Sequence, residues 1–263
     1  MSRPKYAETV DSFFRAVVNV IKIVAYPGFC NICGHPTLFV ITDANLRENV
    51  ICIFCRSFNR ARQMYHLFSL QKKSEDIRIW NMENSGSLHK MLLKTYGDKY
   101  VYSAYLGKGI KSGTIKQGVR HEDVLKTSFP SDHFDFVLSS DVLEHIPKPE
   151  DAFIEIKRIL KPAGIFIFTV PFLEDQEKSD RRAREDEKGE VVLLKEPQYH
   201  GDPLRPEGIL VFTLFGWDML EMARAAGLGC SVQRPYLIRY GIIGPGTLVF
   251  TAVKSMANEG MTQ

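Results

Sequence analysis

The sequence lacks any long, uninterrupted run of apolar residues. The longest such run near the N-terminus, residues 16–25, contains Asn19 and Lys22 and is too short to span a bilayer. Two acids, Glu8 and Asp11, precede this run, whereas a secretory signal begins with a basic region. We therefore expect no membrane span, and we predict a cytoplasmic protein.

The sequence also lacks a large excess of positive or negative residues. The 34 lysines and arginines nearly balance the 31 aspartates and glutamates, which leaves a formal charge of +3 over 263 residues. Nucleic-acid-binding domains usually carry a strongly basic face, so this composition gives no strong nucleic-acid signal. The sequence also has no internal repeat, and its length suits one α/β domain with a small appendage.

Cysteine is scarce, but its arrangement is informative. Four of the five cysteines form two Cys-x-x-Cys pairs, namely Cys30, Cys33, Cys52 and Cys55. In a chain without an export signal, paired thiols favour a metal site over disulfides. The spacing is that of a zinc ribbon, in which two such turns present four thiolates to one structural Zn²⁺ and strands over residues 37–42 and 50–53 bring the turns together. A redox pair or four unrelated buried thiols are the alternatives.

The segment around the cysteines, residues 1–73, is predicted to form a small N-terminal unit. A helix over residues 7–25 is expected to pack on the protein's own body, because its polar face lacks the basic cluster of a membrane-surface helix. A second helix over residues 57–70 carries Arg60 and Arg62, which we interpret as solvated surface arginines. Residues 74–263 are predicted to form the main domain.

The stretch over residues 134–172 contains a strand, a helix and a second strand in order. Its first residues, FDFVL, are aromatic, branched or otherwise apolar apart from one aspartate, as expected of a buried strand. Pro149, followed by Glu150 and Asp151, begins the helix, and a nearly continuous apolar run over residues 165–170 forms the second strand. This order predicts a βαβ unit with parallel strands that are covered on both faces.

This stretch also resembles a known family. FDFVLSS and DVLEHI, followed by a helix and LKPAGIFIFTVP, are similar to the fourth and fifth strands of class I S-adenosylmethionine-dependent methyltransferases, in the small-molecule branch called type 11. The resemblance implies an α/β fold with a Rossmann-like seven-stranded sheet and helices on both faces. Its further strands would cover residues 77–82, 100–105, 119–124, 232–238 and 247–254. A generic Rossmann-like βαβ unit is the alternative.

The resemblance implies S-adenosyl-L-methionine as cofactor and assigns residues to it. The family's Gly-x-Gly-x-Gly loop is reduced here to Gly86, although Asn84 tolerates a left-handed turn. Ser103 and Ala104 stand where the family carries an acid for the ribose hydroxyls, and Asp123 matches the acid that recognises adenine. The complete set implied for the cofactor is Glu83, Asn84, Gly86, Ser103, Ala104, Tyr105, Asp123, Val124, Ser139, Ser140 and Leu143.

A polar insertion of mixed charge follows the fifth strand over about residues 173–200. It is either a solvated loop or a lid over the acceptor site, since open α/β sheets keep their sites at the carboxyl ends of strands. The turn at its end contains Tyr199, His200 and Asp202 beside glycine and proline, which favours the lid. We predict His200 as the catalytic base, oriented by Asp202 or Tyr199, with His145 as the second candidate.

Together these features predict a methyltransferase that acts on the oxygen or nitrogen of a small-molecule or glycan acceptor. The altered glycine loop and the missing ribose acid support an alternative, a non-catalytic methyltransferase-like protein that binds a partner through its zinc ribbon or insertion. A zinc-ribbon nucleic-acid binder is a third possibility, which the modest charge disfavours.

Overall fold

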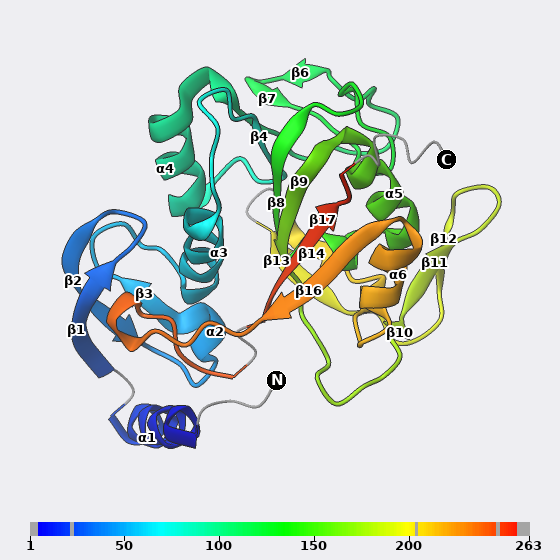
Figure 1. The fold of residues 1–263 in the computed structure, drawn as a ribbon. Helices are drawn as coiled ribbons and strands as arrows, with labels where there is room; N and C mark the ends of the chain where they lie inside the picture. The colour runs from blue at the N-terminus through cyan, green and yellow to red at the C-terminus, as the bar shows by residue number, and fades with distance from the viewer. Residues whose placement is uncertain (1–4, 22–23, 203–204, 246–247, 257–263) are drawn as a thin grey trace, which may run out of the picture.

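A six-stranded sheet forms the centre of the computed structural model, which describes residues 5–21, 24–202, 205–245 and 248–256 (Figure 1). The strand order is β16-β17-β9-β8-β4-β5. The strands are β4 (Ile79–Asn81), β5 (Tyr100–Tyr102), β8 (Phe134–Ser140), β9 (Leu160–Thr169), β16 (Leu228–Gln233) and β17 (Val249–Lys254). β5, β4, β8 and β9 are parallel, whereas β17 is antiparallel to both of its neighbours. The predicted α/β class is confirmed.

The strand predicted over residues 119–124 does not join this sheet as a full strand. Its first part, β7 (Val119–Arg120), pairs instead with β6 (Ile115–Lys116) in a small hairpin. A single parallel bridge between Ala104 and His121 is the link to β5. Glu122 still donates its amide to the Ala104 carbonyl at 3.3 Å, but its side chain accepts hydrogen bonds from Arg120 and Ser128 of the same loop, and the pairing ends there.

Alternate residues of the central strands face two separate cores. Val137 and Phe166 pack in the core beneath α5 (Pro149–Ile159) and α6 (Met219–Ala225). Phe136 and Ile167 pack in the opposite core, beneath α3 (Asn59–Leu70) and α4 (Gly86–Tyr96), as Figure 1 shows. Because helices cover both faces, the strands are apolar on both sides, which explains their lack of polar alternation.

The N-terminal segment forms a three-stranded antiparallel sheet, β1-β2-β3, from β1 (Val24–Cys30), β2 (His35–Ile41) and β3 (Val50–Cys52). The first helix, α1 (Lys5–Ile21), is shorter than predicted because β1 begins within the expected helix. Phe39 of β2 and Leu46 of α2 (Leu46–Asn49) share a core with Ile79 of the central sheet. None of the helices described is both long and apolar enough to cross a membrane.

The connection between β16 and β17 extends to the N-terminal sheet, so the strand predicted over residues 232–238 ends at Gln233. Asn59 donates from Nδ2 to the carbonyl oxygens of Leu46 (2.9 Å) and Ile243 (2.5 Å). Gly241, at φ +67°, lies so close to Phe39 that a Cβ atom would come within 2.7 Å of the ring. These contacts hold the connection against the N-terminal unit.

The insertion after β9 folds into short antiparallel pairs. They are β10 (Asp180–Arg181) with β15 (Thr213–Leu214), β11 (Ala183–Glu185) with β12 (Val191–Leu193), and β13 (Tyr199–Asp202) with β14 (Arg205–Leu210). Its backbone is therefore organised by strand pairing rather than left as a loop without secondary structure. Its role as a lid stays a prediction, as does the division of the chain at residue 73.

Replacing Asn59 by alanine should destabilise the protein by about 3 kcal/mol. The change leaves the buried carbonyls of Leu46 and Ile243 and the amide of Gln63 without this partner. Urea denaturation measures the loss. Asn49→Ala is the matched control, because Asn49 makes an exposed bond to the Asn45 carbonyl and should cost about 0.5 kcal/mol or less. Equal losses in the two variants would contradict the structural role of Asn59.

Candidate active site

The carboxyl ends of β4, β5 and β8 open into one cavity of about 1330 Å³. Residues that follow parallel strands converge at one edge of the sheet, so Glu83, Ala104 and Asp141 meet here although they are far apart in sequence. The N-terminal unit supplies a further part of the wall through Arg47 and Arg60. The cavity is therefore bounded by both parts of the chain.

Most of the residues predicted to bind the cofactor line this cavity. They are Glu83, Asn84, Gly86, Ser103, Ala104, Tyr105, Asp123, Val124 and Ser140. Ser139 and Leu143 are fully buried and do not line it. Ser103 accepts a hydrogen bond from the Trp80 indole at 3.0 Å, and Asp123 accepts one from the Leu125 amide at 2.9 Å.

Two carboxylates, Glu83 after β4 and Glu122 after β7, differ in whether they are free to bind a ligand. Glu122 accepts bonds from Arg120 Nε (2.7 Å), the Ser128 amide (2.8 Å) and the Ser128 hydroxyl (2.6 Å), so its carboxylate is already used. The Glu83 carboxylate accepts no hydrogen bond from the residues that the structure describes. Burial raises the pKa of Glu83 to about 7, although the positive charge of Arg60 opposes the increase. Glu83 is thus a carboxylate that can change charge near neutral pH.

Asp141 joins the sheet to the N-terminal unit at the cavity wall. It follows β8 in a left-handed conformation (φ +54°), where it accepts bonds from Arg47 at 2.7 and 2.5 Å and from Arg60. Burial alone would raise the pKa of Asp141, but the charges of Arg60 and Arg47 outweigh it and hold the pKa well below its usual range. The sequence analysis missed Arg47 and Asp141, although Asp141 begins the DVLEHI motif.

Arg60 and Arg62 are not the solvated surface arginines that we predicted. Arg60 is ion-paired at the cavity with 18% of its side chain exposed, and Arg62 is fully buried. Arg62 donates to the carbonyl oxygens of Val50 (2.6 Å) and Gly241 (2.9 Å). The prediction failed because sequence alone does not show that the N-terminal unit packs on the sheet through this helix.

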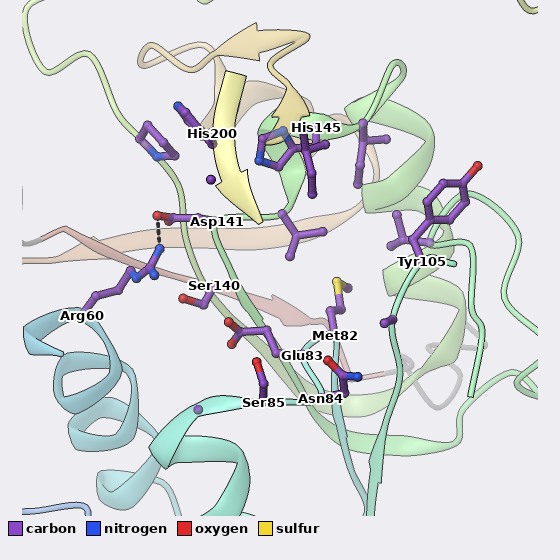
Figure 2. A pocket seen from close by; sticks show the side chains of 18 of the residues that line it. Arg60, Met82, Glu83, Asn84, Ser85, Tyr105, Ser140, Asp141, His145 and His200 are labelled. Carbon is purple, nitrogen blue, oxygen red and sulfur yellow. Dashed lines mark hydrogen bonds and ion pairs between the residues drawn. The ribbon is translucent and has the colours of Figure 1, made fainter. Parts of the chain in front are cut away.

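The predicted catalytic histidines lie together at one end of the cavity. The rings of His145 and His200 meet edge to face, with centroids 5.2 Å apart. Figure 2 shows both rings across the cavity from Glu83 and Ser85. Tyr199 lines the cavity with 55% of its surface exposed, whereas the side chain of Asp202 lies outside the described residues.

Glu144 is a site residue that the sequence analysis missed. Its side chain is fully buried, and its Oε1 lies 3.5 Å from His200 Nδ1 and 3.8 Å from His145 Nε2. Burial raises the pKa of Glu144, although His200 opposes the increase. The available signal was an acid directly before a histidine in DVLEHI, at the carboxyl end of a buried strand.

The four paired cysteines converge on one point in the N-terminal unit. Their Sγ atoms all lie within 4.8 Å of one another, with Cys30 and Cys55 separated by 3.6 Å and Cys33 and Cys52 by 4.0 Å. Arg62 lies beside this cluster and forms no ion pair with a carboxylate of the described residues. Burial lowers the pKa of Arg62 to about 10, and the negative charge that the thiols can carry opposes the decrease.

Comparison with known proteins identifies the central segment. Residues 85–168 match the family model described as "Methyltransferase domain". The match covers α4, β5, β8 and α5 and reaches into β9, and it therefore includes much of the cavity lining. This segment of the chain is therefore similar to a methyltransferase domain.

Solved structures with a similar arrangement include several methyltransferases. A chain of the complex between the Haloferax volcanii Trm112 methyltransferase activator and a methyltransferase is 16% identical, with a TM-score of 0.46, over 77% of this chain and 92% of that one. An S-adenosylmethionine-dependent methyltransferase from Mesorhizobium loti is 15% identical, with a TM-score of 0.45, over 72% and 96% of the two chains. One from Listeria monocytogenes is 17% identical, with a TM-score of 0.45, over 73% and 98%. No curated protein matches the chain.

Replacing Asp141 by asparagine should destabilise the protein by about 3 kcal/mol at pH 7, because two partly buried arginines lose their shared carboxylate. Asp132→Asn is the matched control. Asp132 is also left-handed (φ +54°) and paired with Lys254, but 56% of its side chain is exposed, so its loss should cost about 0.5 kcal/mol.

The effect of Asp141→Asn should depend on pH. Because the folded-state pKa of Asp141 is lowered, its stabilisation is complete above the unfolded pKa of about 3.9 and is lost as the pH falls further. Denaturation at several pH values should therefore show the wild type and the variant converging in acid. A difference that stays constant down to pH 2 would contradict this account of the ion pairs.

Proposed function

We propose that the chain transfers a methyl group from S-adenosylmethionine to a polar small-molecule or glycan acceptor that binds beside His145 and His200. The observation that carries this proposal is the shared cavity. One end is formed by residues of the matched segment such as Ala104 and Asp123, and the other end combines His145 of the same segment with His200 of the insertion. Its volume of about 1330 Å³ exceeds the roughly 300–1,000 Å³ of a typical ligand site, which suits two ligands at once.

The residues around β4 and β5 suit the donor with one exception. Gly86, at φ +85°, begins α4, whose first amides are able to receive the carboxylate of the methionine part. Ala104 offers no carboxylate to the ribose, and Glu122 is used within the protein. Glu83 is then the acid that would serve the donor. When bound, S-adenosylmethionine supplies an electrophilic methyl group on a sulfonium.

The histidine end of the cavity would serve the acceptor. An acceptor hydroxyl is a weak nucleophile, so the site must both hold it in line and help it lose its proton. A histidine provides that help either by accepting the proton or by holding a cation that weakens the O–H bond. His145 and His200 are within reach of such an acceptor in either role, because both line the cavity.

We also propose that the four paired cysteines bind one structural Zn²⁺. Ligands about 2.3 Å from zinc in a tetrahedral site are separated by about 3.8 Å, which agrees with Sγ separations of 3.6 and 4.0 Å. Four thiolates around Zn²⁺ carry a net charge of −2. This charge would compensate the buried guanidinium of Arg62, which has no carboxylate partner in the described structure. The donor set therefore fits zinc.

S-adenosylmethionine should bind to the purified chain, but about one to two decades more weakly than to relatives that keep the ribose acid. Ala104→Glu should tighten binding about tenfold, since a hydrogen bond to a charged group contributes about 1.5–3 kcal/mol. Ala104→Gln is the control of equal size without the charge, and it should gain much less. Titration calorimetry measures all three proteins.

Two outcomes would count against these donor assignments. Equal gains from glutamate and glutamine would remove Ala104 from the ribose position. If the folded wild type gave no heat at millimolar S-adenosylmethionine, the catalytic proposal would fail and the non-catalytic alternative would replace it.

Protein purified without added metal should contain one zinc per chain. Cys52→Ser should lose the zinc and melt at a much lower temperature, because a structural zinc site contributes on the order of 10 kcal/mol to folding. Cys230→Ser is the matched control, since Cys230 lies on β16 away from the cluster and should keep the metal. Elemental analysis and thermal melting check the prediction. Full zinc content in Cys52→Ser would overturn the site.

A further inference from the structure

A second group of metal-ligand side chains lies at the histidine end of the cavity. Glu144, His145 and His200 each offer one ligand atom, and these three atoms lie within 4.8 Å of one another. His145 and Glu144 belong to the turn after β8, η2 (Leu143–His145), whereas His200 lies on β13 of the insertion. The group is separate from the cysteine cluster and contains two imidazoles and one carboxylate in place of thiolates.

The carboxylate of Glu144 is buried, and its nearest polar side chains, His145 and His200, compensate its charge only when they are protonated. Its side chain is 0% exposed, and neither oxygen has a hydrogen-bond partner in the described part of the chain. A buried carboxylate without hydrogen bonds or a positive partner is strongly unfavourable. A cation beside both oxygens would remove that cost.

The distances around Glu144 fit coordination better than hydrogen bonding. Oε1 lies 3.5 Å from His200 Nδ1 and 3.8 Å from His145 Nε2, and both distances exceed a normal N–H···O bond. Nitrogen and oxygen ligands about 2.1 Å from one tetrahedral cation are separated by about 3.4 Å. A small inward shift of the rings would therefore complete the coordination of one ion.

The tautomer of His145 is set in the way that metal sites require. Its Nδ1 lies 2.8 Å from the carbonyl oxygen of Leu210, which can only accept, so Nδ1 carries the proton. In the neutral imidazole with this tautomer, Nε2 is unprotonated and faces Glu144 and His200. A ligand histidine typically donates its other N–H to a carbonyl or carboxylate in this manner, which fixes the ring for the metal.

We propose that Glu144, His145 and His200 bind one divalent first-row transition-metal cation, such as Mn²⁺, Fe²⁺ or Co²⁺. Two imidazoles and one carboxylate are a ligand set that such cations favour, and three protein ligands leave coordination positions open. The positions open toward the cavity, since both histidines line it. Asp141 is not assigned as a ligand because Arg47 and Arg60 already occupy it.

The role of this cation rests on the proposed function. An acceptor hydroxyl bound at an open position would have its pKa lowered by the cation, so that its proton leaves to solvent and the oxygen keeps the electron pair. That oxygen then forms the new bond to the methyl carbon while the electrons of the carbon–sulfur bond go to sulfur. His200 would act here as a ligand through Nδ1 instead of as the general base.

The test is a Mn²⁺ titration of protein that contains one zinc per chain, held by the cysteines, followed by electron paramagnetic resonance of free Mn²⁺. Wild type should bind one Mn²⁺ per chain, and His145→Ala and His200→Ala should each weaken binding about a hundredfold or more. His133→Ala is the matched control, because His133 contacts Arg78 at the opposite end of β8 and should bind as the wild type does. The proposal would be overturned if both histidine variants still bound Mn²⁺ as the wild type does. It would also be overturned if the folded wild type bound no Mn²⁺ at millimolar concentration.

The variant Glu144→Gln tests whether Glu144 is a metal ligand or a structural residue. The amide has the same shape and no charge, so without Mn²⁺ the variant should melt at the wild-type temperature or higher. The rise in melting temperature that Mn²⁺ gives the wild type should disappear. If the metal-free variant melts lower and keeps the Mn²⁺-dependent rise, Glu144 has a structural role and the assignment fails.

The same samples distinguish this proposal from the proposed function. His200→Ala should bind S-adenosylmethionine within a few-fold of the wild type while it loses Mn²⁺. Donor binding by a wild type that binds no Mn²⁺ would overturn the cation site and leave the methyltransferase proposal standing. If the wild type bound Mn²⁺ but no S-adenosylmethionine, the methyltransferase proposal would fail and the cation site would stand.

Discussion

The ion pairs of Asp141 with Arg47 and Arg60 are the interaction on which the site depends. Asp141 stands at the first turn after β8 in a left-handed conformation, and both arginines come from the N-terminal unit. A carboxylate at this buried position would be costly alone, and two guanidinium groups would be costly without it. Each side therefore requires the other, so the N-terminal unit becomes a wall of the cavity rather than a separate appendage.

The central fold could be predicted because its signals are local. A continuous apolar strand, a proline-initiated helix and a second apolar strand determine β8, α5 and β9, and the family resemblance orders the remaining strands. The prediction of a third strand was wrong because its residues are polar and form hydrogen bonds within their own loop, as Glu122 does with Ser128. The hydrophobic pattern of a sequence does not show whether polar side chains will bond within a loop or leave the backbone to pair in a sheet.

The site was less predictable because its key contacts join distant segments. Cys-x-x-Cys spacing is a short-range signal, and the four cysteines do converge. Arg62 gives no such signal, since its burial depends on carbonyl groups of Val50 and Gly241 that the fold brings together. Glu144 was overlooked for a related reason. Its importance follows from the approach of His200, which is supplied by an insertion whose pairing no periodic pattern reveals.

The cysteine cluster and the cavity are connected through α3. Arg62 extends from this helix toward the thiols and the β16–β17 connection, whereas Arg60, half a turn earlier, extends to Asp141 at the cavity. A rigid helix transmits a displacement at one residue to its neighbours, because its backbone hydrogen bonds fix their relative positions. If the thiolates bind zinc as we propose, loss of the metal would remove the charge that compensates Arg62, and the position of Arg60 would become less well defined. The proposed zinc site, although it has no open coordination position, would thus still affect the cavity through the two arginines of α3.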